Sequence, residues 1–206
     1  LLVADRIWDK IVLLNSSENV DLIGEKVSDI ARMRDIDPYD LVFDLLLEEG
    51  AAMHQLLWTS NSFSQSDLDL CLEQDECAVI SDTLALAPYG PLEKKVGSLS
   101  GYGWTPEFLS KYVNEKKIVS IEEGIRRMTS LPAERLGVKD RGTQKENMKA
   151  DILVFDTGSN RSTRPNKEPR SYPNGIEHVF VNGRQTICAG KRTSVNNGEV
   201  LRAPFS

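Results

Sequence analysis

The chain has 206 residues, of which 40% are hydrophobic and 27% are charged, and its formal net charge at pH 7 is −6. This is an ordinary globular balance, and the length fits one domain or one and a half. The sequence pI of about 5.1, the lack of a basic block and the lack of any apolar run near the ~20 residues of a membrane span argue against nucleic acid and membranes as partners.

The chain opens on LLVADRIWDK, which has neither an initiating Met nor the features of a signal peptide. We therefore expect the parent protein to continue upstream. The cysteines Cys71, Cys77 and Cys188 are odd in number and match no zinc spacing or disulfide framework, which favours a reducing, cytoplasmic compartment. The histidines His54 and His178 lie far apart, so a metal site built from this chain alone would lack the commonest ligand.

Strand and helix signals alternate from the start of the chain. Residues 5–15 are rich in β-branched and aromatic side chains and predict a strand. A helix is expected from about Gly24, because apolar side chains recur there at helical spacing. Its buried face would consist of Val27, Ile30 and Ala31.

Two further helices carry recognisable end signals. Asp37 suits an N-cap, Pro38 suits the first helical position, and Gly50 suits the residue after the helix. Ser64 and Asp67 form a capping box for the next helix. The first of these helices would bury Leu41, Val42, Leu45 and Leu46, and the second would bury Leu68, Cys71 and Leu72.

The apolar run Cys77–Ile80 predicts a short strand covered on both faces, as in a parallel sheet. Asp82 follows it directly, and the long loop 83–103, rich in Gly and Pro, comes next. In a parallel barrel the reactive groups lie at the carboxyl ends of the strands. A carboxylate there could accept a proton from a metal-bound water or ligate the metal, but Asp also commonly caps a loop. Position alone leaves these alternatives open.

The next elements are helices with clear starting signals. One is expected at TPEFLSKYVNE, with Thr105 as the cap and Pro106 at the first position. Another is expected at SIEEGIRRMTS, where Ser120 and Glu123 form a capping box. A short helix in LPAERLG would end at Gly137.

After Gly137 the sequence favours strands and turns. ADILVFD (150–156) predicts a strand, and residues 176–190 predict two strands joined by Asn182-Gly183, the strongest short-range hairpin signal. His178 is expected on a partly exposed strand face, and residues 157–173 are expected to form a surface connection.

Several segments together resemble the C-terminal part of the N-acyl-D-amino-acid deacylases (D-aminoacylases), a branch of the metal-dependent amidohydrolase superfamily. The segments are SDTLALAPYGPL (81–92), SIEEGIRRMTSLPAERLGVKDRG (120–142), ADILVFD and GIEHVFVNGRQTICAGKRT (175–193). Because the upstream segment 21–50 resembles the same family, the likeness covers nearly the whole chain.

The resemblance implies an α/β fold. Residues 1–137 would be the last part of a distorted (β/α)₈ amidohydrolase barrel, of the TIM type, and residues 138–206 would supply C-terminal strands of a small β-sandwich. Asn147 stands where relatives usually have Gly, and Asn tolerates the positive φ that such a turn requires.

The resemblance also implies zinc-dependent hydrolysis of the amide in an N-acyl-D-amino acid. Asp82 matches the family's aspartate that takes a proton from the zinc-bound water and passes it to the leaving nitrogen, and it is a possible metal ligand. Tyr102 and Trp104 are candidates for contacting substrate, or for packing beneath their own loop. Many relatives carry a His shortly before the Tyr-Gly of this loop, where the present chain has Leu99 or a neighbour.

The family's metal-binding histidines lie upstream of the segments represented here. The expected partners are therefore a small N-acyl amino acid and the missing N-terminal portion or a partner chain. Two alternatives remain: a catalytically incompetent fragment that serves in binding or assembly, and an amidohydrolase acting on another C–N bond, such as a cyclic amide.

Overall fold

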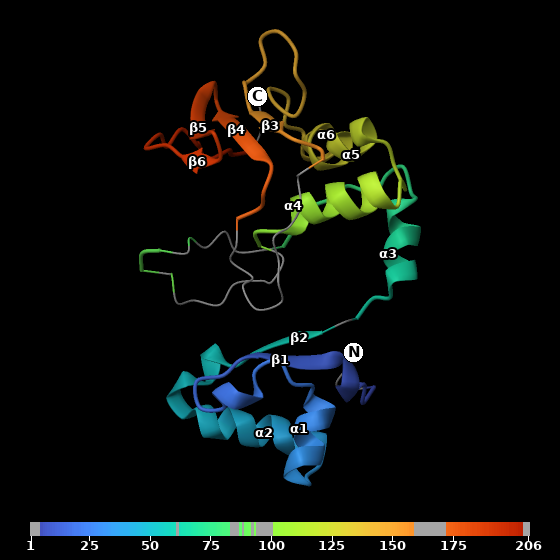
Figure 1. The fold of residues 1–206 in the computed structure, drawn as a ribbon, viewed down its shortest axis with the longest axis vertical. Helices are drawn as coiled ribbons and strands as arrows, with labels where there is room; N and C mark the ends of the chain where they lie inside the picture. The colour runs from blue at the N-terminus through green and yellow to red at the C-terminus, as the bar shows by residue number, and fades with distance from the viewer. Residues whose placement is uncertain are drawn as a thin grey trace. The chain divides into compact units, whose positions relative to one another are not determined.

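The structure is a computed structural model that describes residues 5–60, 62–82, 87, 89–91, 93, 101–158 and 172–203. The chain divides into two compact units, Leu1–Leu68 and Asp69–Ser206, and each has its own hydrophobic core (Figure 1). The division falls within helix α3 (Gln65–Leu72). The boundary predicted at 137/138 concerns the domains of the complete protein and stays a prediction.

The N-terminal unit consists of a short antiparallel ladder and two helices. Strand β1 (Ile11–Asn15) pairs with β2 (Leu57–Ser60). Helices α1 (Val27–Arg34) and α2 (Pro38–Glu49) pack against each other, and α1 contacts β1 (Figure 1). The unit also contains the short 3-10 helices η1 (Trp8–Lys10), η2 (Val20–Leu22) and η3 (Gly50–Gln55).

The predicted core faces of α1 and α2 are confirmed. Leu41 and Leu45 of α2 are fully buried, while Val42 and Leu46 pack at the margin of the same core. Helical spacing places these side chains on one stripe, so the stripe determines which side of the helix is buried. On α1 the buried residues are Val27, Ile30 and Ala31, as expected.

The ends of α2 also follow the sequence. The Asp37 carboxylate accepts a hydrogen bond from the backbone N–H of Tyr39 at 2.8 Å, and Pro38 occupies the first turn, where its missing N–H costs nothing. Gly50 ends the helix with φ +54°, a conformation that residues with a side chain rarely adopt.

Glu49, the last residue of α2, is a buried acid whose carboxylate is hydrogen-bonded to residues 16–18. Its carboxylate accepts hydrogen bonds from the Ser16 hydroxyl, from the Ser17 N–H at 2.9 Å and from the Glu18 N–H at 3.1 Å. Burial raises the pKa of the Glu49 carboxyl, but these hydrogen bonds outweigh it and hold that pKa below its ordinary value. Glu49 therefore ties α2 to the turn that follows β1.

Helix α3 begins as predicted but buries less than predicted. The Asp67 carboxylate accepts from the Ser64 N–H at 2.8 Å, and the Ser64 hydroxyl accepts from the Asp67 N–H at 3.2 Å, which confirms the capping box. Leu68 and Cys71 are exposed, so their predicted burial is wrong for the described chain. Only the last residue, Leu72, packs on the core of the second unit.

The core of the C-terminal unit is built on Phe108, Leu109 and Val113, and apolar side chains of the helix over 121–128 and of the strand over 152–155 pack against them. Helix α4 begins one residue before the predicted cap, after Gly103, so Thr105 and Pro106 lie inside its first turn. The last helix ends at Gly137, which has φ +75°, as predicted. The elements are α4 (Trp104–Glu107), the π-helix η4 (Phe108–Glu115), α5 (Ile121–Met128) and α6 (Ser130–Leu136).

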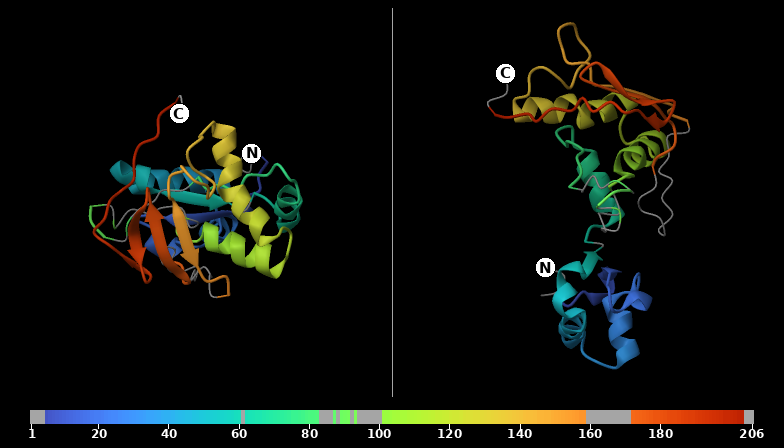
Figure 2. Two further views of the ribbon diagram at one scale, coloured as in Figure 1. Left: turned by 90° about the horizontal axis from the view of Figure 1, so that it is seen from above. Right: turned by 90° about the vertical axis from the view of Figure 1, so that its left-hand side faces the viewer.

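A four-stranded antiparallel sheet lies beside α5 and α6 (Figure 2). The predicted strand and hairpin are confirmed, and Asn182 and Gly183 both have positive φ, as a two-residue hairpin turn requires. Asn147 also has positive φ, as expected. The strands, in sheet order, are β3 (Ile152–Phe155), β4 (Ile176–Val181), β5 (Arg184–Cys188) and β6 (Lys191–Arg192).

Arg141 fastens this sheet to the chain on either side of it. Its guanidinium donates to the Asp151 carboxylate at 2.6 Å, to the Glu199 carboxylate at 2.6 Å and to the Asn182 side-chain oxygen at 3.2 Å. These groups come from the start of β3, the C-terminal segment and the β4–β5 turn. The Arg141 side chain, which is 15% exposed, thus joins three stretches of chain that are far apart in sequence.

Candidate active-site segment

The segment that leads to Asp82 is irregular in the structure. Cys77–Ile80 is not a strand, so that prediction is wrong. A parallel strand needs hydrogen-bonded neighbours, and no strand of the described chain pairs with this run. The Val79 N–H donates to the Arg127 carbonyl of α5 at 3.0 Å, and Ile80 is 73% exposed.

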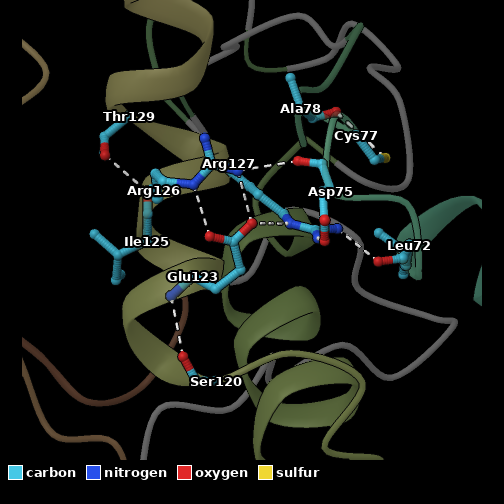
Figure 3. A network of polar contacts seen from close by, with 10 residues as sticks. All are labelled: Leu72, Asp75, Cys77, Ala78, Ser120, Glu123, Ile125, Arg126, Arg127 and Thr129. Carbon is cyan, nitrogen blue, oxygen red and sulfur yellow. Dashed lines mark hydrogen bonds and ion pairs between the residues drawn. The ribbon is translucent and has the colours of Figure 1, made fainter.

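The side chain of Arg127 contacts the residues just before this run, in the segment 72–79 (Figure 3). It is 1% exposed. Its Nη1 donates to the Leu72 carbonyl at 2.5 Å, its Nε donates to the Glu123 carboxylate at 2.7 Å, and its Nη2 lies 4.0 Å from the Asp75 carboxylate. The buried charge is therefore paired and hydrogen-bonded, as burial of a charge requires.

Arg126 adds a second, more exposed contact to the network. Its guanidinium donates to both oxygens of Glu123, at 2.6 and 2.8 Å, and its Nη2 also donates to the Asp75 carbonyl at 3.0 Å. Helix α5 thus contacts the segment 72–79 at two places. The side chains of Arg126 and Arg127 bind its first residues, and the Arg127 carbonyl accepts from the Val79 N–H.

Glu123 departs from its predicted role. The Ser120 hydroxyl accepts from the Glu123 N–H at 3.3 Å, which is half of the predicted capping box. The Glu123 carboxylate turns to the two arginines, and hydrogen bonds from Arg126 and then Arg127 lower the pKa of Glu123 from 4.5 to about 2. The spacing of Glu123 and Arg127, four residues apart on one helix face, is the sequence signal that points to this pair.

The lowered pKa of Glu123 predicts acid sensitivity of the C-terminal unit. Because the folded-state pKa is about 2 and the ordinary value is 4.5, the ionised carboxylate stabilises the fold fully above pH 4.5, and this contribution disappears as the pH falls to about 2. We expect Glu123→Gln to remove that part of the acid dependence in urea titrations between pH 6 and 2. Glu134→Gln, an exposed acid on α6, is the matched control. Parallel pH curves for wild type and Glu123→Gln would contradict the expectation.

The structure does not gather the predicted site residues in one cavity. Asp82 is exposed. The Tyr102 ring lies edge-on to the Tyr172 ring, with centroids 5.3 Å apart. Trp104 lines a cavity whose described lining includes neither Asp82 nor Tyr102. Their roles toward substrate stay predictions.

The cavity that Trp104 lines has a volume of about 1010 Å³ and lies among the helices of the C-terminal unit and β3. Leu109, Ile125 and Phe155 give it an apolar wall, and Arg126 and Lys149 add cationic groups. Sequence reasoning missed it, since its walls come from residues spread between Trp104 and Leu201.

The histidines do not build a metal site in the described chain. His54 is exposed in η3. The Nδ1 atom of His178 accepts from the Ala189 N–H at 3.3 Å and lies 2.9 Å from Nε2 of Gln185, which is a structural contact within the sheet. Among the described residues, no group of three or more His, Cys, Asp or Glu side chains could hold a metal ion.

Two predicted segments fall largely outside the described residues. They are the loop 83–103, which includes Leu99, and the connection 157–173. Within the described residues, no helix is both long and apolar enough to cross a bilayer.

Known protein-family profiles give no match, but individual proteins do. The chain is 28% identical over 166 residues to N-acyl-D-aspartate deacylase of Alcaligenes xylosoxydans xylosoxydans, which covers 79% of this chain and 32% of that protein. It is 35% identical over 82 residues to N-acyl-D-glutamate deacylase of the same organism, covering 40% and 17%. The chain thus spans about a third of the length of the first of these relatives.

Solved structures match over nearly the whole chain. A D-aminoacylase structure, described for the functional role of its binuclear metal centre, has a TM-score of 0.77 and 21% identity, covering 94% of this chain and 38% of that one. N-acyl-D-glutamate deacylase from Bordetella bronchiseptica, complexed with zinc and a phosphonate inhibitor that mimics the tetrahedral intermediate, has a TM-score of 0.70 and 22% identity, covering 96% and 40%. In sequence and in fold, the chain is thus similar to the C-terminal part of the N-acyl-D-amino-acid deacylases.

Proposed function

We propose that this chain is the C-terminal part of a zinc-dependent hydrolase that cleaves the amide of N-acyl-D-amino acids, releasing a carboxylate and the free amino acid. The observation that carries the proposal is the sequence match to deacylases of one chemical class, which extends over 79% of the chain in the longest case. The likeness of fold to solved deacylases supports the same reading of the chain. Within it we retain, as part of the proposal, the last part of a barrel over 1–137 and sandwich strands over 138–206.

Asp82 is the proposed catalytic residue. Its side chain is exposed, and a carboxylate is one of the groups that transfer protons in enzymes. Hydrolysis of an amide needs one group to take a proton from the attacking water and to return a proton to the leaving nitrogen. We assign both transfers to the Asp82 carboxylate, whose position at the end of the segment fixed by α5 leaves it accessible.

Zinc is the proposed metal because a relative of the same fold is complexed with zinc. The described residues do not form a metal site by themselves, since they contain no suitable cluster of ligands. The ligands must come from elsewhere in the protein, with Asp82 as at most one contributor. Tyr102 and Trp104 are retained as proposed substrate contacts at the start of α4.

The remainder of the same protein is the proposed partner. The outer face of α2 exposes Phe43 (63%) and Leu47 (77%), and on β3 both Leu153 and Val154 are exposed, although successive strand residues point to opposite faces. Apolar side chains exposed side by side indicate a surface that another part of the structure covers. The unpaired cysteines fit the proposed cytoplasmic location.

The test compares the complete gene product with the 206-residue chain. We expect the complete protein to contain zinc by elemental analysis and to release free amino acid from N-acetyl-D-amino acids faster than from the L-enantiomers. We expect the isolated chain to show neither property. A complete, zinc-loaded protein that turns over no N-acyl-D-amino acid but opens cyclic amides would redirect the proposal to another C–N bond.

A non-catalytic role is the second candidate, and the exposed apolar residues favour it. In that case the chain itself would be the natural product and would cover these surfaces by assembly. Light scattering distinguishes the two cases: stable, zinc-free oligomers of the chain, together with an absence of any longer zinc-binding product, would support assembly over catalysis.

A further inference from the structure

We propose that Arg127 is a positioning residue for Asp82. It acts through the segment 72–79, which is bound both by the Arg127 side chain and by the Arg127 backbone carbonyl. The inference rests on the proposed function, since it presumes that Asp82 takes part in the reaction.

The side chain of Arg127 fixes the start of this segment. Among the fully buried side chains of the described chain, it is the largest. Nη1 donates to the carbonyl of Leu72, the last residue of α3, at 2.5 Å. Carbonyls at a helix C-terminus have no intrahelical partner and carry partial negative charge, so a cation is well suited to hold this point.

The main chain of Arg127 fixes the other end. Its carbonyl lies in the last turn of α5, where intrahelical partners are missing, and it accepts from the Val79 N–H at 3.0 Å. Val79 precedes Asp82 by three residues. A shift of Arg127 is therefore passed to the stretch that carries Asp82.

Helix α5 provides a firm base for both contacts. A Cβ added at Gly124 would lie 2.9 Å from Cγ2 of Val113 and 3.4 Å from Cε1 of Phe108, so α5 and η4 pack without space between them. Glu123 then orients the Arg127 guanidinium through Nε at 2.7 Å. The network in Figure 3 joins this packed helix to the segment before Asp82.

Stability alone does not account for a buried arginine at this position. Apolar side chains of similar volume often stabilise a protein as well as a buried ion pair does, because they avoid the desolvation of two charges. The guanidinium also fixes the orientation of its partners. Its planar set of N–H donors holds the Glu123 carboxylate and the Leu72 carbonyl at fixed angles, which the ammonium of a lysine cannot do.

The experiment uses Arg127→Lys in the complete, zinc-loaded gene product, with N-acetyl-D-amino acids as substrates. Because the variant keeps the charge and loses the fork, we expect kcat to fall by ~10- to 100-fold with KM changed less than about twofold. Amide hydrogen exchange over 77–82 should be at least ~10-fold faster, while exchange in α1 and α2 is unchanged. Arg135→Lys, an exposed arginine on α6, is the matched control and should change neither quantity.

A double-mutant cycle separates positioning from general stability. If Arg127 acts through Asp82, adding Arg127→Lys to Asp82→Asn should lower kcat by less than about threefold. An unreduced loss in the Asp82→Asn background, or normal kcat despite faster exchange at 77–82, would overturn the positioning role. If Asp82→Asn is too slow to assay, two measurements on Arg127→Lys decide the question: the amide exchange rates over 77–82, and whether kcat falls while KM stays nearly constant.

Failure of the proposed function has a different signature. Full activity of Asp82→Asn would remove the role of Asp82 itself, whatever Arg127 does. If Arg127→Lys does not fold, Glu123→Gln replaces it, because this variant removes the negative charge and one of the two oxygens that accept from the arginines, while keeping the side-chain shape. It should produce the same pattern of lower kcat and faster exchange at 77–82, and an absence of both would contradict the inference.

Discussion

Asp82→Asn is expected to lower kcat by at least ~100-fold in the complete protein, because removing a general acid–base group costs between about 10²- and 10⁴-fold. Asn has nearly the same shape and cannot accept a proton at neutral pH, so the loss would measure proton transfer and not packing. The measurement is the rate of amino-acid release at saturating N-acetyl-D-amino acid, with zinc content determined on the same samples.

Two comparisons make this result specific. Glu76→Gln removes another exposed carboxylate from the same segment and should keep wild-type kcat. Zinc content then separates the two roles open to Asp82: unchanged zinc with lost turnover indicates proton transfer, whereas loss of zinc indicates a ligand. Wild-type turnover with zinc bound would remove Asp82 from the mechanism.

Arg127→Ala is expected to destabilise the C-terminal unit by about 2–5 kcal/mol, since it leaves a cavity in place of a fully buried side chain and leaves the Leu72 carbonyl without its donor. Arg126→Ala is the matched control. Arg126 shares Glu123 as its partner but is 40% exposed, so solvent screens the pair and the variant should lose much less stability.

The measurement is native-state hydrogen exchange of the α5 and α6 amides, which reports the free energy of opening this unit separately from the N-terminal unit. Equal losses for the two arginine variants would show that burial of Arg127 has no energetic consequence. The stabilising effect of the network in Figure 3 would then come from Glu123 and not from the burial of Arg127.

The parts of the fold that could be predicted from sequence are those with local causes. The α2 cap at Asp37, its end at Gly50 and the hairpin turn Asn182-Gly183 depend on residues a few positions apart, and all are confirmed. The buried stripes of α1 and α2 followed in the same way from helical spacing.

The two largest failures concern partners that are distant in sequence. The run Cys77–Ile80 has the composition of a buried strand, but composition does not supply a neighbouring strand, and no strand of the described chain pairs with it. The buried face of α3 was misassigned for a related reason. The spacing of apolar residues gives the phase of a helix, whereas only the packing shows how much of that face is covered.

The candidate site shows the same division. Asp82 was found by its place after an apolar run and by family likeness, but Arg127 was not. Arg126 and Arg127 are adjacent, and both lie within reach of Glu123 on α5. What distinguishes them is the carbonyl of Leu72, which lies 55 positions away in the sequence.

The most direct test of the central claim is a crystal structure of the complete protein with zinc located by anomalous scattering. We expect the Asp82 carboxylate to face the metal, with one oxygen within about 3 Å of a water poised for attack. An Asp82 side chain that points away from the zinc and hydrogen-bonds within its own turn would contradict it.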